Sequence, residues 1–176
     1  DILISVAEAY RQHLDDTASA ISAYEQAVDI TGDEEGLAKL QQLYGELELW
    51  EPLVEVLEQR LEDEYDNEAR TSLLNRIGMI RDEILGQPEP AIRPYEELHE
   101  DDPTDLGVVD KLQRLYRTAE HWADLEQILH TKVDLVDSEA ERLETLRELG
   151  SVQHEHLDDD TSAIASYKQV VEADPD

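Results

Sequence analysis

The chain contains no cysteine and no phenylalanine, and its only aromatic residues are two tryptophans and seven tyrosines. Without cysteine it can form no disulfide, no thiolate metal site and no cysteine nucleophile. Its seven glycines are scattered singly, so no glycine-rich loop is present to hold a phosphate group. No apolar run approaches the roughly 18 residues of a membrane-spanning helix. The core of this 176-residue chain must therefore be mainly aliphatic.

Basic residues are also scarce, at 14 lysines and arginines against 45 aspartates and glutamates, a net charge of −31. Binding to nucleic acid depends on neutralising phosphates with lysine and arginine, so no nucleic acid partner is predicted. The same repulsion argues against anionic membranes. Three explanations of the acidity stay open: a solvated surface that keeps the protein soluble, adaptation to high salt, and an acidic face for a basic partner.

No basic segment followed by an apolar run is present, so no signal peptide is predicted in this stretch. With the lack of cysteine, this favours a cytoplasmic location, although neither observation fixes the compartment. The chain begins without methionine and stops in mid-pattern at Asp174-Pro175-Asp176. We therefore expect it to be a fragment of a longer array.

What the chain does have is a sequence that repeats. The segment 14–24 returns as 157–167, each starting with Leu-Asp-Asp and ending with Ala-Ile-x-x-Tyr or a close variant, and a weaker copy lies at 91–95. Their equivalent isoleucines, Ile21, Ile92 and Ile164, are 71 and 72 residues apart. A fixed period of this kind is typical of a solenoid of stacked helix pairs.

A second motif has the same period: Lys39–Tyr44 with Trp50 returns as Lys111–Tyr116 with Trp122. Each period divides into two repeats of about 36 residues, and leucines in each repeat recur at steps of three and four, as on one face of a helix. We predict an all-α fold, a right-handed superhelical solenoid of about five antiparallel helix pairs in a single domain over residues 1–176. The pairs are expected at about 2–32, 35–67, 70–102, 105–137 and 139–175.

The aromatic residues are expected to wedge between successive helices. This expectation covers Trp50, Trp122, Tyr24, Tyr95 and Tyr167. Replacing Trp122 by alanine is then expected to cost roughly 3–5 kcal/mol of stability.

The last repeat carries large–large–small residues in its first helix and a small residue, an aromatic residue and a closing proline in its second. These residues are Leu146, Leu149, Gly150, Ala163, Tyr167 and Pro175. In this pattern the chain resembles the tetratricopeptide repeat (TPR) family over its whole length. The resemblance implies a non-catalytic scaffold that binds a protein or peptide in a concave groove lined by the first helix of each pair.

The groove positions of that family transfer to residues of all five first helices, and seven of these are taken as candidate partner-binding residues: Asn75, Met79, Arg114, Arg117, Arg147, Ser151 and His154. The three arginines can pair with the carboxylates of an acidic peptide. They can equally pair with neighbouring glutamates such as Glu144 and Glu148, and both readings stay open.

No catalytic motif is present, so no enzyme activity, cofactor or metal site is predicted. His154 and His156 lie beside an acidic turn, but two residues apart on a helix they point about 200° apart and cannot share one metal. Two alternatives to the groove-binding scaffold remain. The protein can be an acidic receptor for basic proteins, or a structural spacer that self-associates through uncapped apolar ends.

Overall fold

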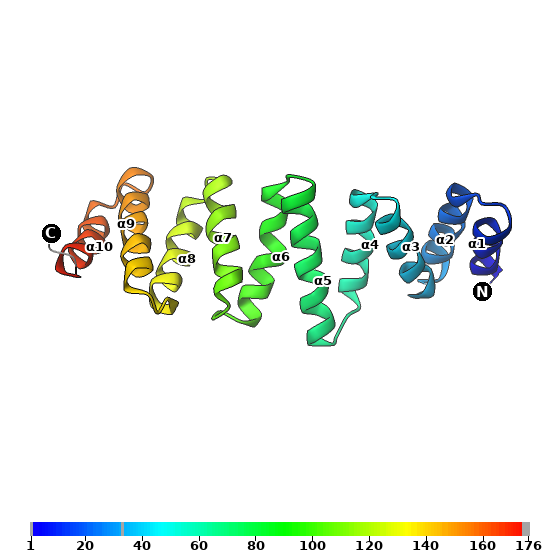
Figure 1. The fold of residues 1–176 in the computed structure, drawn as a ribbon, viewed down its shortest axis with the longest axis horizontal. Helices are drawn as coiled ribbons and strands as arrows, with labels where there is room; N and C mark the ends of the chain where they lie inside the picture. Colours follow the sequence, from blue (N-terminus) through cyan, green and yellow to red (C-terminus); the bar gives the residue numbers. More distant parts are fainter. Residues whose placement is uncertain (1, 33, 174–176) are drawn as a thin grey trace. The chain divides into compact units, whose positions relative to one another are not determined.

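The computed structural model describes residues 2–32 and 34–173, and over these residues the chain forms α-helices, one short π-helix and no β-strand (Figure 1). The all-α prediction is confirmed. The elements are α1 (Ile2–His13), α2 (Thr17–Thr31), α3 (Glu34–Glu46), α4 (Trp50–Glu62), α5 (Asn67–Met79), the π-helix η1 (Ile80–Ile84), α6 (Pro88–Asp101), α7 (Leu106–Thr118), α8 (Trp122–Leu135), α9 (Glu139–Glu155) and α10 (Asp160–Ala173). None of the described helices combines the length and the apolar character needed to cross a bilayer. Pro175, the expected closing proline, lies outside the described residues.

The chain divides into two compact units, an N-terminal unit (Asp1–Leu85) and a C-terminal unit (Gly86–Asp176). Within the N-terminal unit, α1 packs on α2, α2 on α3, α3 on α4 and α4 on α5. Within the C-terminal unit, each helix from α6 to α10 likewise packs on the next one along the chain. Short connections between antiparallel helices produce this order. The helix pairs α1–α2, α3–α4, α7–α8 and α9–α10 are therefore present as predicted within single units, whereas α5 and α6 of the third predicted pair belong to different units.

The turn inside the Leu-Asp-Asp motif has the same backbone in each copy. Asp15, Gly86 and Asp158 occupy equivalent positions and have φ angles of 50°, 63° and 53°. The next residue caps the following helix in two copies: Asp16 Oδ1 accepts from Ser19 N at 3.0 Å, and Asp159 does the same for Ser162. These caps satisfy backbone donors that the first turn of a helix leaves unpaired.

The core of the N-terminal unit consists of leucine, alanine, valine and isoleucine side chains with Tyr24 and Tyr44, and it includes leucines at the predicted steps of three and four. Its contact between α2 and α3 depends on Gly36 in the first turn of α3, where a Cβ atom would lie 2.9 Å from Val28 Cγ2. The absence of a side chain at Gly36 therefore lets α3 approach α2 closely. In the C-terminal unit, Leu112, Leu115 and Leu125 form the corresponding core and are at most 1% exposed.

A tyrosine–glutamate hydrogen bond occurs at the same place of the repeat in both units. Tyr44 Oη of α3 donates to Glu25 Oε1 of α2 at 2.6 Å, and Tyr116 Oη of α7 donates to Glu96 Oε1 of α6 at 2.8 Å. Burial, together with the bond to the carboxylate, raises the pKa of both phenols. The bonds join the second helix of one repeat to the first helix of the next.

The aromatic predictions are confirmed for Tyr24 and Tyr95, which are 1% and 0% exposed. Trp50 and Trp122 are only partly buried, because each is the first residue of its helix and lies at the end of the packed face. The prediction for Tyr167 was wrong, since its side chain is 38% exposed. Among the described residues, no helix follows α10 to cover that ring.

The position of Trp122 lowers the stability loss first expected from its removal. We expect Leu125→Ala to lower the free energy of unfolding by about 2–5 kcal/mol, because this leucine is fully buried. Trp122→Ala should cost less than the roughly 3 kcal/mol that marks the lower end for a fully buried aromatic ring. Urea unfolding followed by circular dichroism measures both. A larger loss for Trp122→Ala than for Leu125→Ala would contradict this placement.

The two tyrosine–glutamate bonds should make stability fall at high pH. Because the pKa of each phenol is raised on folding, its contribution is complete below the ordinary tyrosine pKa of about 10 and is lost as the pH rises above it. We expect the free energy of unfolding of the native chain to fall more steeply above about pH 10 than that of the Tyr44→Phe/Tyr116→Phe variant. Equal slopes for the two proteins would show that the bonds make no pH-dependent contribution.

Candidate functional site

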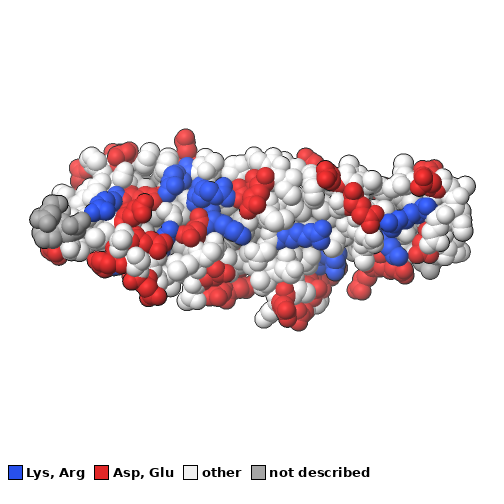
Figure 2. Space-filling model, viewed as in Figure 1, with Lys and Arg blue, Asp and Glu red and all other residues white. Residues whose placement is uncertain are grey.

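Two helices of the C-terminal unit, α7 and α9, carry the predicted arginines at exposed positions. Each of them is the first helix of a hairpin. Arg114 and Arg117 lie one turn apart on α7, and Arg147 lies on α9. In Figure 2, a group of basic side chains lies near α7 with acidic side chains beside it, and smaller basic groups lie elsewhere on the same face. Six of the chain's 14 basic residues belong to α7, α8 and α9: Lys111, Arg114, Arg117, Lys132, Arg142 and Arg147.

Arg117 and Glu148 connect α7 to α9. Arg117 donates to Glu148 Oε1 from Nε at 3.1 Å and also from Nη2. The other carboxylate oxygen of Glu148 accepts from Gln113 Nε2 at 2.7 Å. The reading in which an arginine pairs with a neighbouring glutamate thus holds for Arg117, whose side chain is still 50% exposed. Arg114 and Arg147 also interact with neighbouring groups of the chain.

Ser151 and His154 continue the surface that Arg147 begins, because residues three and four apart share one face of a helix. Ser151 Oγ donates to Glu155 Oε1 at 3.0 Å. His154 Nδ1 lies 2.7 Å from Asp160 Oδ1 and its side chain is 61% exposed. The structure therefore places Arg147, Ser151 and His154 along α9, the helix that Glu148 joins to Arg117 of α7.

Asn75 and Met79 belong to α5 of the N-terminal unit. Asn75 Nδ2 donates to the backbone oxygen of Thr71 at 3.1 Å, a bond within its own helix. Met79 is 39% exposed. We therefore describe the candidate site, called here the α7–α9 surface, as Arg114, Arg117, Arg147, Ser151 and His154.

A largely buried lysine supports the α7–α9 surface, and the sequence analysis missed it. Lys132 of α8 has a side chain only 12% exposed and lies 2.6 Å from Asp110 Oδ1 of α7 and 3.7 Å from Glu141 Oε1 of α9. Its Nζ also donates to Gln113 Oε1 at 2.9 Å. One cation thus joins three helices and, through Gln113 and Glu148, reaches Arg117. Its position 72 residues after Arg60, which donates to Gln41, was the signal that could have revealed it.

A second polar network joins α8, α9 and α10 beneath the surface. Gln153, which is 1% exposed, donates from Nε2 to Glu126 Oε1 at 2.8 Å and accepts at Oε1 from Ser166 Oγ at 2.8 Å. Buried polar groups of this kind remain favourable only while each has its partner. The network fixes the orientation of α9 between its two neighbours, and so the direction of the side chains it exposes.

His156 does not join His154 in a shared site. Its ring stacks on Trp122 with centroids 3.6 Å apart and planes inclined by 10°. His154 faces Asp160 instead. Within residues 2–32 and 34–173, no three histidine, cysteine or acidic side chains are grouped closely enough to hold a metal ion.

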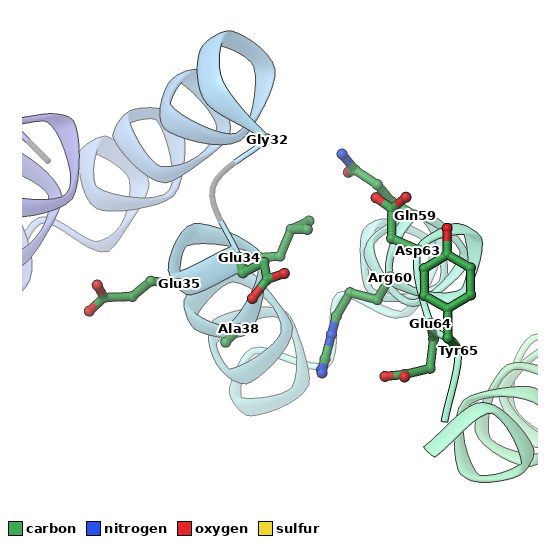
Figure 3. A pocket seen from close by; sticks show the side chains of 10 residues that line it. Gly32, Glu34, Glu35, Ala38, Gln59, Arg60, Asp63, Glu64 and Tyr65 are labelled. Atoms are coloured by element: carbon green, nitrogen blue, oxygen red, sulfur yellow. The ribbon is translucent and has the colours of Figure 1, made fainter. Parts of the chain in front are cut away.

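The N-terminal unit has a pocket of about 660 Å³ between the start of α3 and the end of α4 (Figure 3). It is lined by Gly32, Glu34, Glu35, Leu37, Ala38, Gln59, Arg60, Asp63, Glu64 and Tyr65. Four of these residues are acidic and one is basic. Figure 3 shows Glu34 on the α3 side of the gap and Arg60 reaching into it from α4. Tyr65 is 89% exposed, so the mouth combines an open aromatic ring with negative charge.

Comparisons with known proteins bear on the fold. No protein-family profile and no curated protein sequence matches the chain. Among solved structures, MamA AMB-1 matches at 19% identity and a TM-score of 0.54, over 99% of this chain and 89% of that one. A mutant of MamA matches at 19% identity and 0.51, over 99% and 94%. YrrB, described as a TPR protein with an unusual peptide-binding site, matches at 12% identity and 0.50, over 99% and 86%. The chain therefore has a TPR-like fold, as the resemblance implied.

The buried network around Gln153 gives a test of how α9 is held. Gln153→Leu should lower the free energy of unfolding by about 1–3 kcal/mol, because Glu126 and Ser166 then lose their partner. The triple variant Glu126→Val/Gln153→Leu/Ser166→Ala removes all three polar groups and should recover part of that loss. Val54 stands one period before Glu126, and Ala23 stands two periods before Ser166, so both replacements occur at equivalent positions of the chain. Thermal denaturation measures the stability of both variants. A triple variant that is less stable than the single variant would contradict the network.

Proposed function

We propose that this protein is a non-catalytic interaction scaffold, and that the α7–α9 surface binds an acidic segment of a protein partner. The observation that carries this proposal is the gathering of exposed arginines on α7 and α9 in a chain of net charge −31. Elsewhere on so acidic a chain, a carboxylate is repelled by most of its surroundings. At the α7–α9 surface, it meets guanidinium groups instead.

The chemistry of the surface suits a carboxylate ligand. A guanidinium group binds a carboxylate through two parallel N–H···O bonds. Arg117 already binds a carboxylate of the chain, since its Nε and Nη2 both donate to Glu148 Oε1, and Lys132 and Gln113 join the same helices. Because an exposed ion pair contributes only about 0.2–1 kcal/mol, a ligand carboxylate can share or replace Glu148 at low cost. Ser151 and His154 offer further hydrogen-bonding groups along α9.

A second candidate function rests on the acidic pocket of the N-terminal unit. Glu34, Glu35, Asp63 and Glu64 line it, and the ring of Tyr65 lies open beside them. A lysine or arginine side chain of a basic protein can be attracted by these carboxylates and by the aromatic face. This candidate corresponds to the acidic-receptor alternative and predicts the opposite partner charge.

A peptide-display selection separates the two functions. We expect peptides enriched on the native protein to carry aspartate or glutamate, and their affinity, measured by calorimetry, to fall about tenfold or more in Arg114→Glu/Arg147→Glu. The matched control Arg70→Glu/Arg93→Glu makes the same change in net charge on α5 and α6, outside the candidate site, and should leave the affinity nearly unchanged. Affinity should also fall as the salt concentration rises, because exposed charges are screened.

The opposite outcome of the selection would contradict the first candidate function. Enrichment of basic peptides that bind Arg114→Glu/Arg147→Glu as well as the native protein would overturn the first candidate and favour the acidic pocket. Those peptides should then lose affinity for Glu34→Lys/Glu64→Lys, whose substituted positions line that pocket. Circular dichroism of each variant confirms that its helices are retained.

A further inference from the structure

The polar network of the C-terminal unit has a counterpart in the N-terminal unit. In the C-terminal unit, Lys132 donates to Gln113 Oε1, and Gln113 Nε2 donates to Glu148. One period earlier, Arg60 of α4 extends toward α3 and donates to Gln41 Oε1 (Figure 3). The cation and the amide are thus kept, and the oxygen of each amide faces the cation.

The carboxylates of the C-terminal network have no counterpart in the N-terminal unit. Two of them lie within 4 Å of the Lys132 ammonium group, and the third accepts from Gln113. These three residues are Asp110, Glu141 and Glu148, and one period before them stand Ala38, Ala69 and Arg76. Three negative charges are therefore replaced by two methyl groups and one positive charge.

The guanidinium group of Arg76 lies beside Gly45 of α3. A Cβ atom at Gly45 would be 3.7 Å from Arg76 Nη2, and apart from neighbouring residues of α3 no other described atom comes within 4 Å of that position. Gly45 stands one period before Arg117, so here the guanidinium group comes from α5 instead of α3. Because Gln41 and Gly45 are one turn apart, they share one face of α3. The Gln41 amide and the Arg76 guanidinium group therefore lie over the same face.

No carboxylate of the described chain uses these two donors. Within residues 2–32 and 34–173, no acidic side chain forms an ion pair with Arg76, and Gln41 Nε2 has no acceptor. The next acidic residue along α3, Glu46, is already bound by Arg11 Nη2 at 3.0 Å and by Gln42 Nε2 at 2.7 Å. Gln41 and Arg76 are both partly buried. Partly buried donors without an acceptor favour the binding of a ligand that supplies one.

Glu148 indicates which ligand such donors accept. One oxygen of its carboxylate accepts from the amide of Gln113, and the other accepts from the guanidinium group of Arg117. In the N-terminal unit the same two kinds of donor are present, but the carboxylate between them is missing. A carboxylate has two acceptor oxygens and binds most strongly to charged donors such as guanidinium.

We infer that Gln41 and Arg76 form a binding site for one carboxylate side chain, a glutamate or an aspartate, of another protein. Arg60 is a positioning residue, because it holds the amide oxygen of Gln41 and so directs Nε2 toward the ligand. Neither Gln41 nor Arg76 lines the acidic pocket of the same unit. The site contains no residue of the α7–α9 surface and does not depend on the function proposed for that surface.

The test follows the side-chain ¹⁵N resonances of Gln41 and Arg76 by NMR in the intact chain. The probe is glutamate with both backbone ends blocked, and blocked glutamine is its neutral control, both at constant ionic strength and neutral pH. We expect saturable shifts of both resonances with the glutamate probe alone. Arg76→Gln should weaken binding, followed at Gln41, by about fivefold or more, because the charged donor is removed.

Two further variants separate the site from general charge effects. Arg76→Glu introduces the residue that stands at the equivalent position of the C-terminal unit, and it should abolish the response of Gln41, because a carboxylate of the chain then accepts its N–H group. Arg93→Glu makes the same change in net charge at a side chain that is 85% exposed, and it should leave the response unchanged. Circular dichroism of each variant checks that its helices are retained.

Four results would overturn the inference. The first is the absence of a saturable shift at Gln41 and Arg76, and the second is an equal shift with blocked glutamine. The third is undiminished binding to Arg76→Gln. The fourth is a larger response to inorganic phosphate than to the glutamate probe at the same concentration, which would identify a phosphate site instead of a carboxylate site.

Discussion

The fold depends on one contact that each unit repeats: the second helix of a hairpin buries its apolar stripe under the first helix of the next hairpin. A single hairpin leaves that stripe in water, so stability comes from neighbours and accumulates along the chain. Gly36 shows how close the approach is, since even a Cβ atom would meet Val28. The hydrogen bonds of Tyr44 and Tyr116 then add one polar link at the same contact. Turns, caps and exposed surfaces are arranged around this burial.

The helices were predictable because their signals are local. Leucines at steps of three and four, a repeated Leu-Asp-Asp turn and a fixed period describe the same elements independently. The buried tyrosines also followed from the repeat. The two tryptophans did not, because a residue's type does not reveal that it occupies the first position of its helix. Tyr167 differs from its copies for another reason: its burial depends on a neighbouring helix, and no such helix follows α10 in the described chain.

The candidate site was less predictable than the fold. Helix periodicity placed Arg114, Arg117 and Arg147 on exposed faces of neighbouring first helices, and the structure puts them there. It did not reveal that Arg117 is tied to Glu148, or that Lys132 is almost buried among three acceptors. Such pairings depend on which side chains meet across helices, and the sequence offers several acidic candidates for each cation. Because acidic residues are abundant in this chain, the packing of the helices decides which of them pairs with a given lysine or arginine.

The network of Glu126, Gln153 and Ser166 also has a consequence for how the chain reaches its structure. Helices at equivalent positions of a repeat can dock on the wrong copy during folding, as happens in repeat proteins. If α9 packed against α4 in place of α8, the amide of Gln153 would face Val54 instead of Glu126 and would be buried without a partner. The equivalent helices α4 and α8 thus differ in polarity at this position. The difference disfavours the packing of α9 on the wrong helix.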